Sequence, residues 1–325
     1  MKLLPKYTKV LTLGASRTER ALVGEVVLQE KVDGSQLRFG INEDGEVLCG
    51  SKSINFEPGI CDKMFEPGVK YVESIASKIK ETFKPDTYFF CEYLQKPKHN
   101  VLKYDSIPKN HLVLFDVLHN GAWLSSDRQA LEVHASDLEI DVVPELWRGE
   151  IEMQRVGAGE KFDRTKGYTG LDFLKNMIQT TMSFLGGVQI EGVVIKNYKE
   201  NFEIGNMIFP LFTKYVREEY KEKHNSEWKS RSGKGSLQEY FDGFCNENRW
   251  LKAIQHLKEK GELEQSPRDI GKLIAEIQRD IKEEEKENIK DFLYKNFIKD
   301  IMRRSVRNFP QWYKELLIKE NVKGE

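Results

Sequence analysis

Two kinds of hydrophobic pattern divide this chain near residue 218, and they constrain its fold more than any other feature. Before that point, short runs rich in Val, Ile, Phe and Tyr predict strands: residues 24–32, 36–42, 46–52, 87–94, 111–119, 189–198 and 207–216. Asp44-Gly45 predicts a hairpin turn between the second and third of these runs. Helical periodicity interrupts the strand pattern in residues 69–83, 126–138 and 170–187. Because long helical crossovers are rare, we expect a mostly antiparallel α+β domain rather than a doubly wound parallel sheet.

The C-terminal part of the chain carries the second pattern, which is helical. A polar stretch over residues 221–236, rich in Gly, Ser and Lys, predicts a linker. Beyond it we expect helices around residues 236–247, 249–260, 267–287, 289–306 and 310–321. The helix over residues 289–306 is predicted to be amphipathic, with an apolar face of Tyr294, Phe297, Ile298, Ile301 and Met302. The chain is therefore predicted to form two domains, residues 1–222 and a small all-α domain over residues 223–325.

Composition excludes several classes of protein. The 325 residues include 51 basic and 52 acidic side chains, so any site for a polyanion must be a local cluster of Lys and Arg. The four cysteines show no CxxC pair and no histidine at metal-ligand spacing, which argues against a zinc site. Nothing resembles a signal peptide or a membrane span, so we expect a soluble protein of a bacterial or virus-infected host cytoplasm, without a membrane partner.

Lys31 is the residue whose surroundings most suggest chemistry. In the segment EKVDG it ends an apolar strand, Asp33 can accept a hydrogen bond or hold a metal-bound water, and Gly34 lets the backbone approach a ligand. A lysine attacks phosphorus only as the neutral amine, so we expect burial and nearby cations to lower its pKa. The lysines expected to converge on it are Lys52, Lys196 and Lys214. On its own, this short pattern is more typical of a hairpin that carries a surface lysine.

Later apolar strands each carry charged residues. A charge inside an apolar strand is costly unless it has a partner, so several in succession indicate a shared ligand. The residues are Glu92 in FFCEYL, Asp116 in LVLFDV, Glu191 and Lys196 in IEGVVIK, and Lys214 in LFTKYV. Plainer interpretations also fit: Phe115 as a core aromatic, Lys52 as a strand-end lysine and Asp116 as a turn cap.

The order of these segments resembles a known superfamily. The series EKVDG, SKS, CEYL, LFDV, EGVVIK and FTKYV, over roughly residues 25–220, is similar to the motifs of the lysine nucleotidyltransferases. These include ATP-dependent DNA ligases, RNA ligases and mRNA capping enzymes. The resemblance implies an ATP-grasp-like domain and three steps: Lys31 takes AMP from ATP, AMP passes to a 5′-phosphate end, and a 3′-hydroxyl displaces it to seal the strand.

The resemblance also implies roles for single residues. Lys31 is the nucleophile, and Asp33 is an implied catalytic residue beside it. Lys196 and Lys214 would contact the AMP phosphate and the leaving pyrophosphate, and Glu191 would bind Mg²⁺ or Mn²⁺. The implied nucleotide-binding residues are Glu30 at the adenine edge, Phe115 stacked on the adenine, Glu92 on the ribose, and Gly34, Gln36, Arg38, Lys52, Glu191, Lys196 and Lys214.

Two departures from the superfamily pattern bear on the subfamily. Lys214 stands alone where two lysines separated by one residue are usual, so one phosphate contact is missing or comes from elsewhere, such as Arg217. Gln36 occupies a position where Arg or Asn is common, with Arg38 further along the same strand face. No role is assigned to the histidines at 99, 111 and 119.

The helical C-terminal part favours one branch of the superfamily. DNA ligases and capping enzymes continue into an OB-fold barrel, which would show alternating strands and turns. We therefore expect an ATP-dependent RNA ligase, similar to phage and bacterial enzymes of the nick-sealing and RNA-editing kinds, that joins 5′-phosphate and 3′-hydroxyl RNA ends. The alternatives are a minimal DNA ligase, a guanylyltransferase, and an inactive relative that binds nucleotide or nucleic acid.

A basic stripe on one predicted helix suggests how RNA could dock. Four basic residues recur every four positions and two aromatic residues follow: Lys295, Lys299, Arg303, Arg307, Trp312 and Tyr313. A phosphate backbone along the stripe would relieve its repulsion, and the rings could stack on bases. The plainer interpretation is a solvated helix face with Trp312 in a local core.

Other partners are expected only in outline. DNA or a mixed duplex could replace RNA, and a kinase or phosphatase could heal the ends before they are joined. A monomer is the default expectation.

Overall fold

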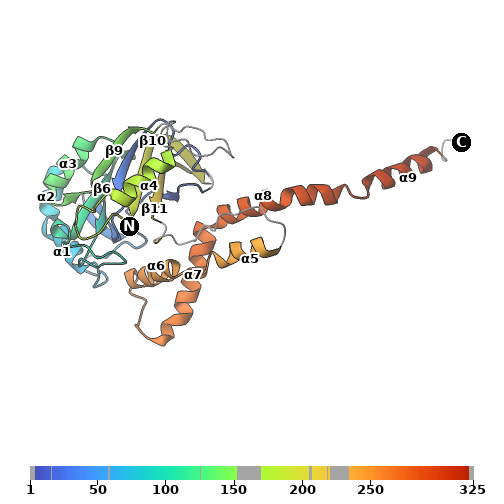
Figure 1. The fold of residues 1–325 in the computed structure, drawn as a ribbon. Coiled ribbons are helices and arrows are strands. Elements are labelled where there is room, and N and C mark those ends of the chain that lie inside the picture. The colour runs from blue at the N-terminus through green and yellow to red at the C-terminus, as the bar shows by residue number, and fades with distance from the viewer. Residues whose placement is uncertain are drawn as a thin grey trace. The chain divides into compact units, whose positions relative to one another are not determined.

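The computed structural model describes residues 4–15, 17–57, 59–124, 126–151, 170–204, 207–217, 219 and 234–321. The chain divides into two compact units, Met1–Glu276 and Ile277–Glu325 (Figure 1). The expected domain boundary between residues 222 and 223 lies outside the described residues. Among the described residues, no helix is long and apolar enough to cross a membrane.

One sheet of the first unit carries the segments that were predicted to bear Lys31, Lys196 and Lys214. Its strands are β1 (Leu11–Thr12), β11 (Met207–Val216), β10 (Gly192–Ile204), β2 (Glu25–Glu30) and β9 (Glu145–Glu150), in that order. All neighbours are antiparallel except β1 and β11. The register places Val193 beside Glu30 and Val194 beside Lys214.

The second sheet carries the remaining predicted site strands. It runs β4 (Val47–Ser51), β3 (Ser35–Ile41), β5 (Thr87–Tyr93), β6 (Leu112–His119) and β7 (Ala122–Trp123), while β8 (Asp141–Val142) pairs with β6 in parallel. The predicted turn at Asp44-Gly45 joins β3 to β4, with Gly45 at φ 77°. This positive φ is the reason that the turn needs a glycine.

Helices cover one face of each sheet. In the second sheet, Leu37, Phe39 and Cys91 pack against α1 (Glu66–Ser74), α2 (Ala76–Thr82) and α3 (Arg128–Asp137) (Figure 1). In the first sheet, Leu28 and Ile195 pack against α4 (Gly170–Thr180). A short 3₁₀ helix, η1 (Lys109–His111), precedes β6. The opposite faces of the two sheets meet each other, because Trp123 of β7 lies 6.1 Å from Phe212 of β11 between ring centroids.

The predicted helical region is confirmed. It comprises α5 (Lys234–Asp242), α6 (Glu247–Glu259), η3 (Pro267–Asp269), α7 (Ile270–Glu284), α8 (Lys286–Ser305) and α9 (Phe309–Asn321). Asn246 caps α6, and Ser266 and Asp269 form a capping box before α7. The fold is therefore α+β with mostly antiparallel sheets and a helical C-terminal region, as the sequence predicted.

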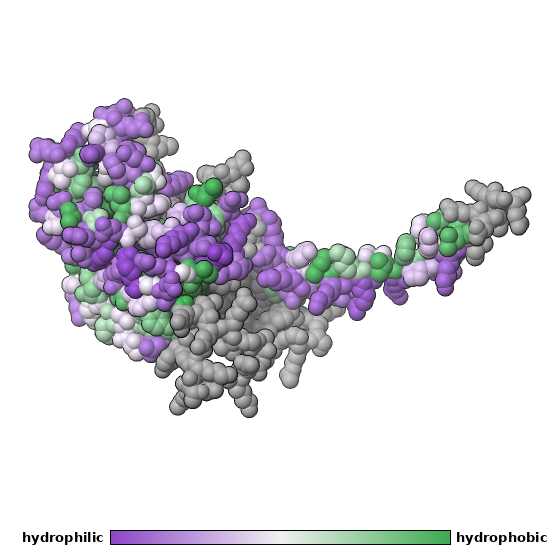
Figure 2. Space-filling model, turned by 90° about the horizontal axis from the view of Figure 1, so that it is seen from above, coloured by the Kyte–Doolittle hydropathy of each residue, from purple (hydrophilic) through white to green (hydrophobic). Residues whose placement is uncertain are grey.

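The second unit exposes much of its apolar surface. The apolar face predicted for residues 289–306 is present, yet Tyr294, Ile301 and Met302 are exposed. Figure 2 shows green apolar residues along one edge of α8 and α9 and purple hydrophilic residues along the other. Trp312 is 55% exposed, so the interpretation that places this ring in a local core is wrong.

Candidate active site

Lys31 follows β2 and faces Glu191, which directly precedes β10. Pairing of β2 with β10 brings the two together across 160 residues of sequence, and the Lys31 backbone N–H donates to the Gly192 carbonyl at 3.0 Å. The Lys31 Nζ donates to Glu191 Oε2 at 2.6 Å, with side chains 26% and 13% exposed. The amine therefore lies in a partly sheltered ion pair that a ligand can reach, and the surface-hairpin interpretation of Lys31 does not fit.

The charge state of Lys31 differs from expectation. Burial opposes its positive charge, but attraction to Glu191, Glu92 and Asp33 outweighs burial, so the pKa of Lys31 is raised. The prediction that converging cations lower this pKa is wrong, because acids rather than lysines dominate its surroundings. Without a bound ligand, Lys31 is a protonated ammonium.

Glu92 is the second carboxylate of this cluster. Burial, together with repulsion from Asp33, Glu191 and Glu259, raises its pKa to about 8 despite the attraction of Lys31. Its Oε1 accepts the Gly34 backbone N–H at 3.1 Å. Burial also raises the pKa of Glu191. The carboxylates therefore repel one another, and a cationic ligand would stabilise them.

The turn after Lys31 is held from several sides. Asp33 Oδ2 accepts the backbone N–H groups of Val101 and Leu102 at 2.8 and 2.7 Å, and the Asp33 N–H donates to the Tyr104 hydroxyl at 2.8 Å. Asp33 therefore fixes the loop that follows β5 onto this turn, a contact that its sequence position alone could not show.

Gly34 must remain a glycine for a reason of space. A Cβ at this position would lie 2.6 Å from the Tyr93 carbonyl and 2.8 Å from Glu92 Cγ. The Gly34 carbonyl accepts Asn100 Nδ2 at 2.7 Å and Gln255 Nε2 at 3.1 Å. Neither Asn100 nor Gln255 was identified from the sequence.

Glu30 points to the opposite side of β2 from the inter-sheet face. It is buried, and its oxygens accept the Ser183 hydroxyl at 2.5 Å and the Phe184 backbone N–H at 3.2 Å. Glu30 is next to Lys31 in the sequence, but its side chain contacts the segment that follows α4. These two contacts engage both carboxylate oxygens of Glu30.

Lys196 belongs to a second buried cluster. Its Nζ donates to the Phe115 carbonyl at 2.6 Å and to Asp116 Oδ2 at 2.8 Å, and the two charged side chains are 1% and 0% exposed. The Tyr7 hydroxyl donates to the same Asp116 oxygen at 2.7 Å. Burial lowers the pKa of Lys196 and raises that of Asp116, while their attraction opposes both shifts. Asp116 is therefore the ionic partner of Lys196 and not a turn cap.

Phe115 lies at an irregularity in β6. The register of β5 and β6 shifts at this residue, since Phe90 pairs with Asp116 and Cys91 with Leu114. A bulge of this kind turns a side chain away from the regular alternation. The partly buried Phe115 ring lies 5.0 Å from the Tyr7 ring and 5.6 Å from Lys196 Nζ.

Arg38 and Gln36, both predicted to bind nucleotide, have different surroundings. Arg38 is buried and donates to the carbonyls of Leu4, Pro5 and Ser51 and to Asn55 Oδ1, so it ties the N-terminal segment to the loop after β4. Gln36 pairs with Glu92 across the strands, and its buried Nε2 has no hydrogen-bond partner within the described part of the chain.

Two predicted lysines lie near other charges. Lys52 is exposed and lies close enough to His256 of α6 to help lower the pKa of that imidazole, for which burial is the larger cause. Lys214 lies close enough to Glu191 to lower its pKa, although burial raises that pKa overall. The structure therefore brings Lys31, Asp33, Glu92, Glu191 and Lys214 together, while the Lys196 side chain is paired with Asp116.

The described residues contain no group of three or more His, Cys, Asp or Glu side chains arranged to hold a metal ion. Glu191 alone still suits a hard divalent cation that keeps waters and phosphate oxygens as its other ligands. The mutual repulsion of the carboxylates supports such a fit.

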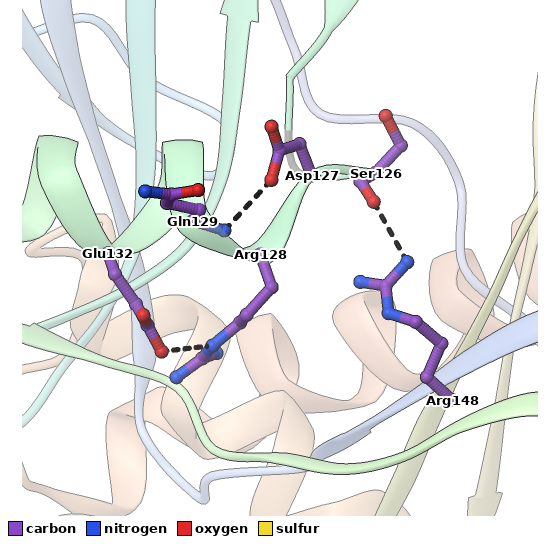
Figure 3. A pocket seen from close by; sticks show the side chains of 6 residues that line it. All are labelled: Ser126, Asp127, Arg128, Gln129, Glu132 and Arg148. Carbon is purple, nitrogen blue, oxygen red and sulfur yellow. Dashed lines mark hydrogen bonds and ion pairs between the residues drawn. The ribbon is translucent and has the colours of Figure 1, made fainter.

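A separate surface pocket of about 710 Å³ lies beside the start of α3 (Figure 3). Its arginines are already engaged, because Arg128 Nε donates to Glu132 at 2.6 Å and Arg148 donates to the Ser126 carbonyl at 2.9 Å. Asp127 caps the helix there. None of the candidate site residues lines this pocket.

Comparison with known proteins gives a family. The sequence model of the RNA ligase family matches residues 24–215, which is more than half of the chain. A search of curated proteins found no match.

Solved structures of RNA ligase from Naegleria gruberi are similar to this chain. A point mutant in the apo state matches with a TM-score of 0.43 and 14% identity over 65% of this chain and 56% of that chain. Another point mutant, with AMP and Mn, matches with a TM-score of 0.45 and 13% identity, over 67% of this chain and 57% of that chain. The chain thus spans little more than half the length of these proteins.

Proposed function

Since the chain belongs to the RNA ligase family, we propose that it is an ATP-dependent RNA ligase that joins 5′-phosphate and 3′-hydroxyl RNA ends through AMP bound covalently to Lys31. The observation that carries this proposal is the pair of Lys31 Nζ and Glu191 Oε2 at 2.6 Å, inside the matched region and beside Glu92 and Asp33. The three acidic side chains around this one amine support a chemical task for Lys31.

In the proposed first step, Lys31 Nζ bonds to the α-phosphorus of ATP and the bond to pyrophosphate breaks. The ammonium must first lose a proton, and Glu191 is the closest group that can receive it. A divalent cation, Mg²⁺ or Mn²⁺, would offset the carboxylate charge and so favour the neutral amine. Glu191 also orients the amine, because the 2.6 Å hydrogen bond fixes the direction of Nζ.

The other site residues are proposed to bind the nucleotide. Glu92 would hold the ribose hydroxyls, and its raised pKa makes it able to donate as well as accept a hydrogen bond near neutral pH. Phe115, set at the bulge of β6, would stack on the adenine. Lys214, near Glu191, would contact the phosphates.

Three further assignments are changed by the contacts. Glu30 is engaged with Ser183 and Phe184, so a role at the adenine edge would require it to release one of them. Lys196 and Arg38 support the walls of the site through buried contacts and are proposed as structural residues. Gln36 and Lys52 remain proposed nucleotide-binding residues.

Labelling separates this proposal from its alternatives. The protein is incubated with ATP or GTP labelled in the α-phosphate and with Mg²⁺ or Mn²⁺, and label that survives denaturation is measured in the wild type and in Lys31→Ala. Label from ATP that is lost in the variant supports a ligase, whereas label from GTP indicates a guanylyltransferase. No label from either nucleotide supports an inactive binding protein.

Sealing assays then test the substrate. Nicked duplex RNA, single-stranded RNA, nicked DNA and mixed duplexes, each with 5′-phosphate and 3′-hydroxyl ends, are compared under one salt condition. Preference for an RNA substrate supports the proposal, and sealing confined to DNA supports the minimal DNA ligase.

A further inference from the structure

Helix α6 reaches the turn that follows the candidate nucleophile. The Gln255 side-chain amide lies 3.1 Å from the Gly34 carbonyl, 3.3 Å from Ser35 Oγ and 2.9 Å from Glu259 Oε1, measured from Nε2. Gly34 and Gln255 are separated by 221 residues of sequence, and all these residues belong to one compact unit. The helical region therefore contacts the Lys31 turn directly.

The same turn is held from its other side. Asn100 Nδ2 donates to the Gly34 carbonyl at 2.7 Å, and His99 Nε2 lies 2.9 Å from Ser35 Oγ. His99 Nδ1 accepts the Gln95 backbone N–H at 3.1 Å, so Nε2 is the nitrogen that carries the proton. Burial lowers the pKa of His99 to about 4, which keeps this arrangement at neutral pH.

The side chains that hold the Gly34–Ser35 turn, called the clamp below, affect Lys31 because the turn directly follows it. Gly34 is three residues after the lysine, and its N–H also donates to Glu92. A shift of the turn would move Lys31 and Glu92 relative to each other, and small displacements of reacting groups cost a large part of the rate. The Gly34 carbonyl is shared by Asn100 from the loop after β5 and Gln255 from α6, so the helix supplies one of the two side-chain contacts that fix it.

We propose that Gln255 is a positioning residue for nucleotidyl transfer, through which α6 holds the Gly34–Ser35 turn in the geometry that Lys31 requires. This inference rests on the proposed function for its kinetic consequence, although the clamp itself is a property of the folded chain. Gln255 does not touch the reacting atoms, so its effect is expected on the rate of the chemical step and not on the binding of ATP.

The test compares Gln255→Leu with Gln238→Leu in the full-length protein. Gln238 is an exposed glutamine of α5 that donates to Asp242 at 3.0 Å, so the control removes a hydrogen bond of the same type away from the turn. In single-turnover labelling from ATP, Gln255→Leu is expected to lower the rate constant about three- to tenfold, which corresponds to one lost hydrogen bond. The ATP concentration for half-maximal rate is expected to change less than about twofold.

Hydrogen exchange tests the clamp without relying on activity. In the absence of nucleotide, the peptide that contains residues 32–36 is expected to exchange faster in Gln255→Leu than in the wild type or in Gln238→Leu, because the turn opens more often. Equal exchange in all three proteins overturns the clamp whether or not the protein labels itself.

The two measurements separate failure of the inference from failure of the proposed function. If the wild type takes no label from ATP, the function fails and the exchange measurement still decides whether Gln255 fixes the turn. If the wild type is labelled and Gln255→Leu matches the control in rate, the positioning role is refuted.

A second variant keeps the length of the side chain. Gln255→Glu replaces the amide that lies 2.9 Å from Glu259 Oε1 by a carboxylate. A carboxylate cannot donate to the Gly34 carbonyl, so the single-turnover rate constant is expected to fall at least as far as in Gln255→Leu. An unchanged rate would count against the positioning role.

Discussion

The charge state of Lys31 can be tested directly through Glu191. Replacing Glu191 by Gln keeps the shape of the side chain but removes the charge that lies 2.6 Å from Nζ. A charge-assisted hydrogen bond contributes about 1.5–3 kcal/mol, and one pKa unit corresponds to about 1.4 kcal/mol. The pKa of Lys31 is therefore expected to fall by about one to two units in Glu191→Gln.

The assay measures the neutral amine and does not depend on catalysis. The protein without nucleotide is treated at pH 7 with limiting amine-reactive anhydride, and modification of the peptide that contains Lys31 is followed by mass spectrometry. Because only the neutral amine reacts, Glu191→Gln is expected to be modified about 10- to 100-fold faster than the wild type. In the wild type, the reactivity is expected to rise only at alkaline pH.

A matched control removes a carboxylate from a surface ion pair. Glu139 accepts Lys78 Nζ at 2.7 Å, and both side chains are well exposed. Glu139→Gln should leave the reactivity of Lys31 unchanged. If Glu191→Gln reacts at the wild-type rate or more slowly, then Glu191 does not raise the pKa of Lys31.

Further predictions concern stability and RNA. Glu92 has a pKa of about 8 in the folded state, above its unfolded value, so the folded state loses stability as the pH rises from about 4.5 to 8. In urea unfolding, Glu92→Gln should therefore stabilise the protein more at pH 8 than at pH 5. Equal effects at the two pH values would contradict this. Lys196→Met leaves the buried Asp116 carboxylate without its cation and should lower the free energy of unfolding by about 3–5 kcal/mol. If the variant instead loses labelling from ATP at unchanged stability, Lys196 contacts a phosphate. Charge reversal of Arg303 and Arg307 should weaken RNA binding and flatten its salt dependence by roughly 0.7 per lost phosphate contact, with labelling intact; unchanged binding would refute the RNA-docking role of the stripe.

The sequence predicted the parts of the fold that depend on local pattern. The hairpin at Asp44-Gly45 and the helices after residue 234 follow from turn chemistry and periodicity. The order of the motifs singles out both Lys31 and Glu191, but their ion pair was not predicted, and it follows from the pairing of β2 with β10.

Tertiary contacts explain what the sequence could not show. The sign of the Lys31 pKa shift depends on three acids that lie far from one another along the chain, and the assumed convergence of lysines gave the wrong direction. Lys196 and Asp116 meet only because two sheets face each other. The approach of Gln255 to Gly34 depends on how α6 packs, for which its helical periodicity gives no signal.

Lys31 as the nucleophile is tested most directly by the mass of the peptide that contains it after incubation with ATP and Mg²⁺. This peptide is expected to gain the mass of one AMP, pyrophosphate is expected to remove it, and Lys31→Ala is expected to gain nothing. AMP found on another residue, or its persistence in Lys31→Ala, would contradict the assignment of Lys31 as the nucleophile.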